Sequence, residues 1–328
     1  MKTGLWAAAL SLLLALAPSL GVRTTARSAP SGRPPRTVTL WLDWYPNSDH
    51  AGVYVAMARG YYARYGLEVN AQVPPNATDA LPLLAHGNGD IGISYEADVL
   101  LSRASHIPVV ATAAIVHGAL NCIMTLKSSG IARPRQLQGK TVGVAGVASD
   151  YKNIPAIVRR DGGAPASVKI VTLNYDLLQA LLTRRVDAIE GVFWTWEALQ
   201  AERSGHKVNV MRVDRYGVPP YDELVFATGA NQVRSEAATF RLFQKATFQG
   251  YAYAAAHPDE AARIMLGAPG VLSKSQSLIA ESIRALGPLY HDAQGRYGVF
   301  SVAQWQAYAR WLGARTDARA ALTTALLP

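Results

Sequence analysis

Short apolar, β-rich runs alternate with helix-like patterns from Thr37 onward. The runs are TVTLWLD, LEVNAQV, DIGISY and PVVATAAIV, and the segments around 50–64 and 78–86 and from 96 have the spacing of helices. This alternation predicts a mainly parallel sheet with crossover helices. It restarts after residue 126 with TVGVAG, VKIVTL, VDAIEG and KVNVMRV, separated by helical patterns near 150–160, in YDLLQALLTRR and from Trp194. The sequence therefore predicts a second α/β unit.

One late strand, LVFATG, follows the loop RYGVPPYDE, and the chain is then helical to its end. A single strand followed by helices cannot form a third sheet, so we expect it to return to the first unit. The prediction is two α/β lobes joined by a two-strand hinge, with a ligand cleft between them. Lobe 1 comprises 37–120 and the mostly helical 224–328, and lobe 2 comprises 121–223.

The N-terminus has the three-part pattern of a secretory signal, which we assign to residues 1–21. Lys2 precedes an apolar run from Leu5 to Ala17, and Pro18, Ser19 and Gly21 follow. A retained anchor is the alternative to cleavage. Residues 22–36 are rich in Pro, Ser and Arg without apolar periodicity, which predicts a flexible leader.

Charge and cysteine content exclude several classes of protein. Five positive charges of the net +9 lie in residues 1–36, which hold no acidic residue, so +4 remains for the rest of the chain. Nucleic-acid or acidic-lipid binding by the folded part is therefore disfavoured. The single cysteine, Cys122, permits no intramolecular disulfide, and its apolar surroundings predict a buried, inert thiol.

Common catalytic motifs are missing from the sequence. It has no GxSxG, HExxH or GxxxxGK motif and no Cys/His cluster with zinc-site spacing. We therefore expect no catalytic residue, no metal and no cofactor. The segment GVAGVAS at 143–149 is best explained as a tight strand-to-helix turn. The alternative is that the helix start near Ser149 binds an anionic group through backbone N–H groups.

Four loops that end strands combine an aromatic residue with a carboxylate or an amide. They are DWYPNSDH at 43–50, SYEAD at 94–98, FWTWE at 193–197 and VPPYDE at 218–223. Aromatic faces stack on flat rings, while carboxylates and amides hydrogen-bond to ring edges. The four loops together predict a cleft that holds a planar heterocycle.

Each candidate side chain also has a structural alternative. These alternatives are core packing for Trp44, Trp194 and Trp196, helix caps for Asp43 or Asp49, a helix-dipole contact for Glu96, a solvated helix face for Glu197, and a hydrogen-bonded structural histidine for His50. Repetition of the same chemistry at four lobe-facing turns favours a site.

These segments also resemble a known family. DWYPNSDHAGVYVAMARGYYARYGLEV, GDIGISYEADVLLSRA, LQGKTVGVAG, VDAIEGVFWTWE and PPYDELVFATG are similar to NMT1/THI5-like periplasmic solute-binding proteins, from about Thr37 to about Pro258. The resemblance implies the type II periplasmic binding protein fold and the capture of a thiamine pyrimidine precursor, such as hydroxymethylpyrimidine or formylaminopyrimidine, for an ABC importer. Riboflavin, another small heterocycle or a sulfonate is the alternative ligand.

The resemblance also implies the ligand-binding residues. They are Trp44, Asn47, His50, Tyr95, Glu96, Trp194, Glu197, Tyr221 and Glu223. The implied partners are a permease and an ATPase subunit; we expect a monomer, with no nucleic acid, at the periplasmic or extracytoplasmic face.

The rival within the family is the pyrimidine synthase, which uses a lysine-bound pyridoxal phosphate and its own histidine. SYEADVLL offers neither side chain, and the CCCFC stretch of the synthase is replaced by PPYDELVF. A binding protein without enzymatic activity is therefore the prediction.

Overall fold

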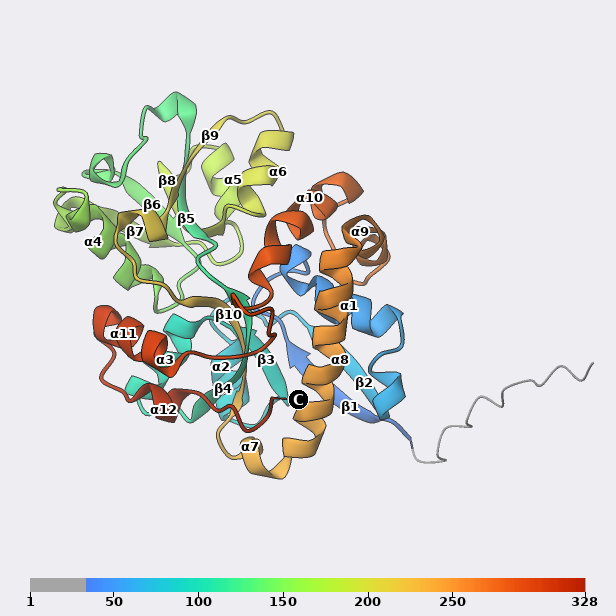
Figure 1. The fold of residues 1–328 in the computed structure, drawn as a ribbon. Helices are drawn as coiled ribbons and strands as arrows, with labels where there is room; N and C mark the ends of the chain where they lie inside the picture. Colours follow the sequence, from blue (N-terminus) through green and yellow to red (C-terminus); the bar gives the residue numbers. More distant parts are fainter. Residues whose placement is uncertain (1–33, 328) are drawn as a thin grey trace, which may run out of the picture. The chain divides into compact units, whose positions relative to one another are not determined.

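The computed structural model describes residues 34–327. The predicted signal segment, 1–21, and most of the predicted leader lie outside this range. Two five-stranded sheets carry the fold, in the orders β2-β1-β3-β10-β4 and β7-β6-β8-β5-β9. In Figure 1 the green and yellow middle of the chain forms one sheet with its helices, whereas the blue start and the orange to red end share the other.

The first sheet contains strands from both ends of the described chain. Its strands are β1 (Arg36–Trp41), β2 (Leu67–Gln72), β3 (Ile91–Ser94), β4 (Val109–His117) and β10 (Asp222–Gly229). β1 lies parallel to β2, with Val38 opposite Val69, and to β3. Alternate residues of β1, Val38 and Leu40, are fully buried, as its apolar alternation requires. We call this sheet and its helices lobe 1.

The second sheet is formed by a continuous middle segment. Its strands are β5 (Asn121–Leu126), β6 (Thr141–Val144), β7 (Lys169–Thr172), β8 (Ala188–Phe193) and β9 (Val208–Arg212). We call this sheet and its helices lobe 2. The chain crosses between the lobes twice, from β4 to β5 and from β9 to β10. The segment boundaries 37–120, 121–223 and 224–328 remain our proposal for the extent of the lobes.

Each sheet has one inner strand that runs against its neighbours. β10 is antiparallel to β3 and β4, and β5 is antiparallel to β8 and β9. Both strands come directly after a crossing. A chain that enters a sheet at the carboxyl ends of its parallel strands has to run in the opposite direction, so the expectation of a mainly parallel sheet needs this correction.

Helices cover both sheets. Lobe 1 has α1 (Ala51–Ala58), α2 (Ala80–Ala85), α3 (Glu96–Ala104), α7 (Gln232–Ser235), α8 (Ala237–Ala256), α9 (Pro258–Leu266), α10 (Gln276–Leu286), α11 (Val302–Leu312) and α12 (Ala318–Ala321). Lobe 2 has α4 (Asp150–Arg160), α5 (Leu177–Leu182) and α6 (Glu197–Arg203). The helix expected from Trp194 thus begins at Glu197, and the one expected over 50–64 ends at Ala58. Within residues 34–327, no helix has the length and apolar character needed to cross a membrane.

Helices α1 and α8 lie side by side in Figure 1 and touch through glycines. A Cβ atom at Gly250 of α8 would overlap the carbonyl oxygen of Gly52 in α1. A Cβ at Gly52 would in turn overlap the ring of Tyr251. The two backbones therefore approach too closely for any side chain at these positions, and this contact fixes the helical end of the chain on lobe 1.

We predict that Gly250→Ala lowers the free energy of unfolding by about 1–3 kcal/mol, because α8 must move away from α1 to accommodate the methyl group. Chemical denaturation measures the change. Gly267→Ala is the matched control, since its Cβ would lie 3.5 Å from the nearest atom, the carbonyl oxygen of Ile264. Equal losses in the two variants would contradict the prediction.

Candidate functional site

The loop at 43–50 is built by its own polar side chains. Asn47 caps the short helical turn Ser48–His50, because its Oδ1 accepts the Asp49 N–H at 2.7 Å. The Asn47 N–H donates to Nδ1 of His50 at 3.2 Å. Nδ1 is thus an acceptor, so the His50 proton belongs on Nε2, which lies 2.8 Å from Oδ1 of Asp43. The cap is Asn47 rather than Asp43 or Asp49, and His50 is fully buried as a hydrogen-bonded histidine.

Asp43 joins this loop to the next strand end. Its Oδ2 accepts the hydroxyl proton of Tyr95 at 3.0 Å. Tyr95 directly follows β3 and precedes α3. Asp43 is buried, with 3% of its surface exposed, and both of its oxygens accept hydrogen bonds. Asp43, His50 and Tyr95 therefore form one fixed polar group on lobe 1.

Aromatic rings meet across the lobes. Trp44 of lobe 1 lies edge-on to Tyr175 of lobe 2, with ring centroids 4.7 Å apart. Tyr45 packs on the same ring at 4.8 Å. The Tyr175 hydroxyl donates to the carbonyl of Pro74 at 3.0 Å. Trp44 is only half-buried, so part of its indole remains accessible beside this contact.

Glu197 is a buried residue of lobe 2, not a solvated helix residue. It begins α6 and is 7% exposed. Its Oε2 accepts the Phe193 N–H at 2.9 Å. Burial raises the pKa of Glu197 to about 7, and the charge of Asp43 adds to this effect. The charge of Asp43 in lobe 1 therefore acts on the Glu197 carboxyl of lobe 2.

Glu223 ties the two chain crossings together. Its Oε2 accepts the N–H groups of Leu120 at 2.6 Å and Asn121 at 2.8 Å, and the hydroxyl proton of Tyr221 at 2.7 Å. Leu120 lies in the β4–β5 crossing and Asn121 begins β5, whereas Glu223 lies in β10. Burial raises the pKa of Glu223 to about 7, against the effect of these three hydrogen bonds. The charge of Asp43 also raises the pKa of Glu223.

Two further acidic groups lie near these carboxyls. Asp49 is 1% exposed, and neither carboxylate oxygen has a hydrogen-bond partner within the described chain. Burial raises its pKa well above the usual range, and the charges of Asp43, Glu197 and Glu223 add to the shift. In lobe 2, Glu190 and Asp150 are fully buried neighbours, and burial together with the Glu190 charge raises the pKa of Asp150 well above its usual range.

Three cavities are lined by residues of both lobes. One of about 260 Å³ lies between Trp44, Tyr45 and Tyr175 and reaches Glu197. A second of about 260 Å³ lies between Asp43, Tyr95 and the turn 146–148. A third of about 20 Å³ lies between Tyr95 and Glu223. No lysine, arginine or histidine is among the residues that line these three cavities, so the cleft is acidic and aromatic.

The nine predicted residues divide into two groups. Trp44, Tyr95, Glu197 and Glu223 line the cavities between the lobes. The others have contacts that the fold itself uses, and they line none of these three cavities: Asn47 caps, His50 bonds Asp43, Glu96 accepts the Asp222 N–H at 2.7 Å, Trp194 donates Nε1–H to the Ala119 carbonyl at 3.0 Å, and Tyr221 stacks on Tyr308 at 4.7 Å. Their ligand contacts stay a prediction.

Sequence reasoning missed Tyr175 and the contact between Asp98 of the SYEAD loop and Ser149 at the start of α4. Tyr175 lies in LNYD, a strand-end loop that combines an aromatic residue with an amide and a carboxylate, so the same pattern would have found it. Asp98 and Ser149 are 51 residues apart and meet only because the lobes meet. Cys122 is buried, as expected, and burial raises its pKa well above the usual range. Among the residues that the structure describes, no group of three or more His, Cys, Asp or Glu could hold a metal ion.

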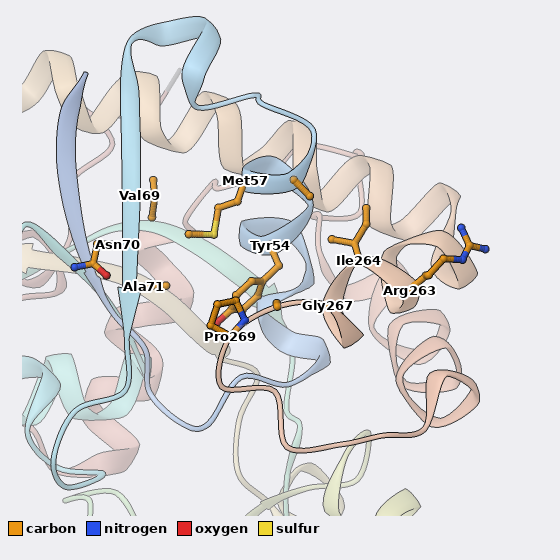
Figure 2. A pocket seen from close by; sticks show the side chains of 11 residues that line it. Tyr54, Met57, Val69, Asn70, Ala71, Arg263, Ile264, Gly267 and Pro269 are labelled. Atoms are coloured by element: carbon orange, nitrogen blue, oxygen red, sulfur yellow. The ribbon is translucent and has the colours of Figure 1, made fainter. Parts of the chain in front are cut away.

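A separate hollow of about 760 Å³ lies on lobe 1 between β2, α1 and α9. Figure 2 shows that Tyr54, Met57 and Val69 point into it, so its walls are largely apolar. None of the nine predicted residues lines it. The hollow lacks the carboxylates of the cleft and offers a planar polar ring few hydrogen-bond partners.

Comparison with known proteins gives a family and a fold. A family model described as NMT1/THI5 like matches residues 47–261. A formylaminopyrimidine-binding protein of Halalkalibacterium halodurans is 31% identical over 307 residues, which cover 93% of this chain and 92% of that protein. A 4-amino-5-hydroxymethyl-2-methylpyrimidine phosphate synthase of Saccharomyces cerevisiae is 26% identical over 156 residues, 47% of this chain and 46% of that protein.

Among solved structures, the alkanesulfonate-binding protein SsuA of Xanthomonas axonopodis bound to MOPS has a TM-score of 0.70 at 13% identity. The match covers 89% of this chain and 99% of that chain. SsuA of Escherichia coli matches with a TM-score of 0.65 at 15% identity, covering 88% of this chain and 97% of that one. The expected family resemblance and the two-lobed periplasmic binding protein fold are both confirmed.

We predict that the free energy of unfolding falls as pH rises from about 5 to about 8. Glu197 and Glu223 have a pKa of about 7 in the folded chain, against about 4.3 when unfolded, so the folded state retains protons that the unfolded state has lost. Each residue contributes up to about 3 kcal/mol to this fall. Glu197→Gln and Glu223→Gln should flatten the pH dependence measured by chemical denaturation, whereas the exposed control Glu202→Gln should not. A flat profile for the unsubstituted chain would contradict the assignment.

Proposed function

Because the chain belongs to the NMT1/THI5-like family, we propose that it is the exported solute-binding protein of an ABC importer and captures a thiamine pyrimidine precursor between its lobes. The ligand is of the hydroxymethylpyrimidine or formylaminopyrimidine type. The lobes close on it, and the closed form delivers it to a membrane permease with its ATPase. The protein carries out no chemistry on the ligand.

The observation that carries this proposal is the acidic, aromatic lining of the cleft. Trp44 and Tyr175 offer ring faces, and Glu197 and Glu223 offer acceptor atoms from lobe 2 and the hinge. An aminopyrimidine has a flat face and an exocyclic amino group that donates N–H. Such a ligand supplies the donors that buried carboxylates need.

Cavity size and charge support a pyrimidine over the alternative ligands. The two larger cavities between the lobes are each about 260 Å³, below the roughly 300–1,000 Å³ of pockets for drug-sized molecules. A one-ring ligand suits this size better than the three-ring flavin of riboflavin. A sulfonate is disfavoured because no basic side chain lines these cavities.

Closure follows from contacts on both sides of the cleft. A ligand that touches Trp44 in lobe 1 and Glu197 in lobe 2 binds the closed arrangement better than an open one, and this difference in affinity shifts the population toward closure. The two crossings, near Gly118 and Gly217, are the segments where the chain can rotate. Gly118 and Gly217 both have positive φ, 134° and 85°, which gives these links backbone freedom.

Titration calorimetry tests the ligand. We predict that the purified protein binds hydroxymethylpyrimidine or formylaminopyrimidine with at least 100-fold higher affinity than riboflavin or an alkanesulfonate, a difference of about 2.7 kcal/mol. Mass spectrometry of the released ligand should return it chemically unchanged. Binding of riboflavin alone, or a product of altered mass, would contradict the proposal.

Substitution tests the site. We predict that Trp44→Ala lowers pyrimidine affinity about tenfold through lost ring contact, and that Glu197→Gln lowers it about 10-fold to 100-fold because an amide N–H₂ replaces an acceptor. The aromatic control is Tyr253→Ala on α8, whose ring contacts Arg59 and Glu260 on the surface of lobe 1. Unchanged affinity in both cleft variants would place the site elsewhere.

A further inference from the structure

A carboxylate of one lobe sits on the helix start of the other. Asp98 lies in the first turn of α3 in lobe 1, and Ser149 immediately precedes α4 in lobe 2. Oδ1 of Asp98 accepts the Ser149 N–H at 3.0 Å, and Oδ2 accepts the Ser149 hydroxyl proton at 2.9 Å. Both residues are buried, with 7% and 6% of their surfaces exposed. Both oxygens of one side chain are thus used in contact between the lobes.

The start of α4 is where an anion would bind. The first N–H groups of a helix lack partners within the helix, and the helix dipole favours negative charge there. In this chain three of the donors around this helix start are already taken by carboxylates. The Gly146 N–H donates to Oδ2 of Asp150 at 2.8 Å, and the Ser149 N–H and hydroxyl donate to Asp98. Two carboxylates of the chain therefore fill the position that a phosphate or sulfonate would need.

We infer that Asp98 is a specificity-determining residue that latches the two lobes together and excludes phosphate, sulfate and sulfonate groups from the start of α4. An incoming anion would meet the charge of Asp98 and find the Ser149 N–H and hydroxyl already donating to it. An uncharged heterocycle meets neither obstacle. The choice of ligand rests on the proposed function, whereas the exclusion of inorganic anions is a property of the chain itself.

The electrostatic surroundings strengthen the exclusion. Burial raises the pKa of Asp98 to about 6, and the hydrogen bonds from Ser149 lower it, so the carboxylate is ionised at pH 7.5. Asp150 and Glu190 lie beside the same helix start, and the charges of Glu190 and Asp98 both raise the pKa of Asp150. No lysine, arginine or histidine lines the cavity that includes Asp98 and the turn 146–148. An anion there has no opposite charge to offset the repulsion.

The latch is supported by other contacts between the same lobes. The Ala77 N–H donates to Oδ1 of Asn174 at 2.9 Å. Arg203 of α6 contacts Ser277 at 2.8 Å and Glu281 at 2.5 Å, both on α10. These contacts lie at exposed or half-buried positions, where hydrogen bonds and ion pairs contribute little. In the Asp98–Ser149 pair, by contrast, both residues are buried. We therefore expect this pair to contribute more than these other contacts to holding the lobes together.

The experiment compares the unsubstituted protein, Asp98→Asn and Ser149→Ala by titration calorimetry at pH 7.5, with inorganic phosphate and with the unphosphorylated pyrimidine. Asp98→Asn removes the charge, whereas Ser149→Ala removes one latch bond and keeps the charge. We expect phosphate affinity to rise at least tenfold in Asp98→Asn only. We expect pyrimidine affinity to fall in both variants, because the closed arrangement loses hydrogen bonds.

The matched control is Asp259→Asn, an exposed carboxylate of α9 paired with Arg284. Thermal unfolding checks that each variant folds, and Asp98→Ser replaces Asp98→Asn if the amide variant does not. Phosphate binding that is equal in Asp98→Asn and the unsubstituted protein would overturn the inference, as would an equal gain in Ser149→Ala. Absence of pyrimidine binding in every protein, with the expected phosphate pattern, would overturn the proposed function and leave the role of Asp98 intact.

Discussion

Buried carboxylates without lysine or arginine partners are the constraint on which the site depends. Where the lobes meet, Asp43, Glu197 and Glu223 take their hydrogen bonds from backbone N–H groups, a histidine and tyrosine hydroxyls, and Asp49 has no partner within the described residues. A buried acceptor without a donor costs free energy. The cleft therefore favours molecules that bring N–H groups and disfavours molecules that bring negative charge.

The same carboxylates also organise the fold. Glu223 holds the β4–β5 crossing against the start of β10, so the two links between the lobes form one hydrogen-bonded unit. Asp222, its neighbour, accepts from Trp305 Nε1–H at 2.8 Å and donates its N–H to Glu96. The hinge is thereby connected to α3 and α11. A substitution at Glu223 is therefore expected to alter the geometry of the hinge as well as the proposed ligand contact.

Much of the fold could be predicted from sequence because hydrophobic periodicity is local. The alternation of strands and helices, the return of the late strand to the first sheet and the burial of Cys122 were all accessible in this way. The antiparallel direction of β5 and β10 was not, because it depends on the edge at which the chain enters a sheet. Helix starts shifted by a few residues, as at Glu197, because the FWTWE segment first forms a turn.

The residues of the candidate site were harder to predict from the sequence, because the site depends on tertiary contacts. The strand-end rule found Trp44 and Glu197, which line one cavity from opposite lobes. It could not separate side chains that face the cleft from those that build the loops, because Asp43, Asn47 and Asp49 are all suitable caps and only the backbone path selects Asn47. The contact between Asp98 and Ser149 joins two lobes, so neither local segment carries a signal for it.

The central claim is that the acidic cleft holds an N–H-donating aromatic ring between the lobes. A crystal structure of the protein with formylaminopyrimidine tests it most directly. The account predicts the ring against Trp44, with its amino group within hydrogen-bonding distance of Glu197 or Glu223. A ring bound in the apolar hollow of lobe 1 shown in Figure 2, with the cleft side chains unchanged, would contradict it.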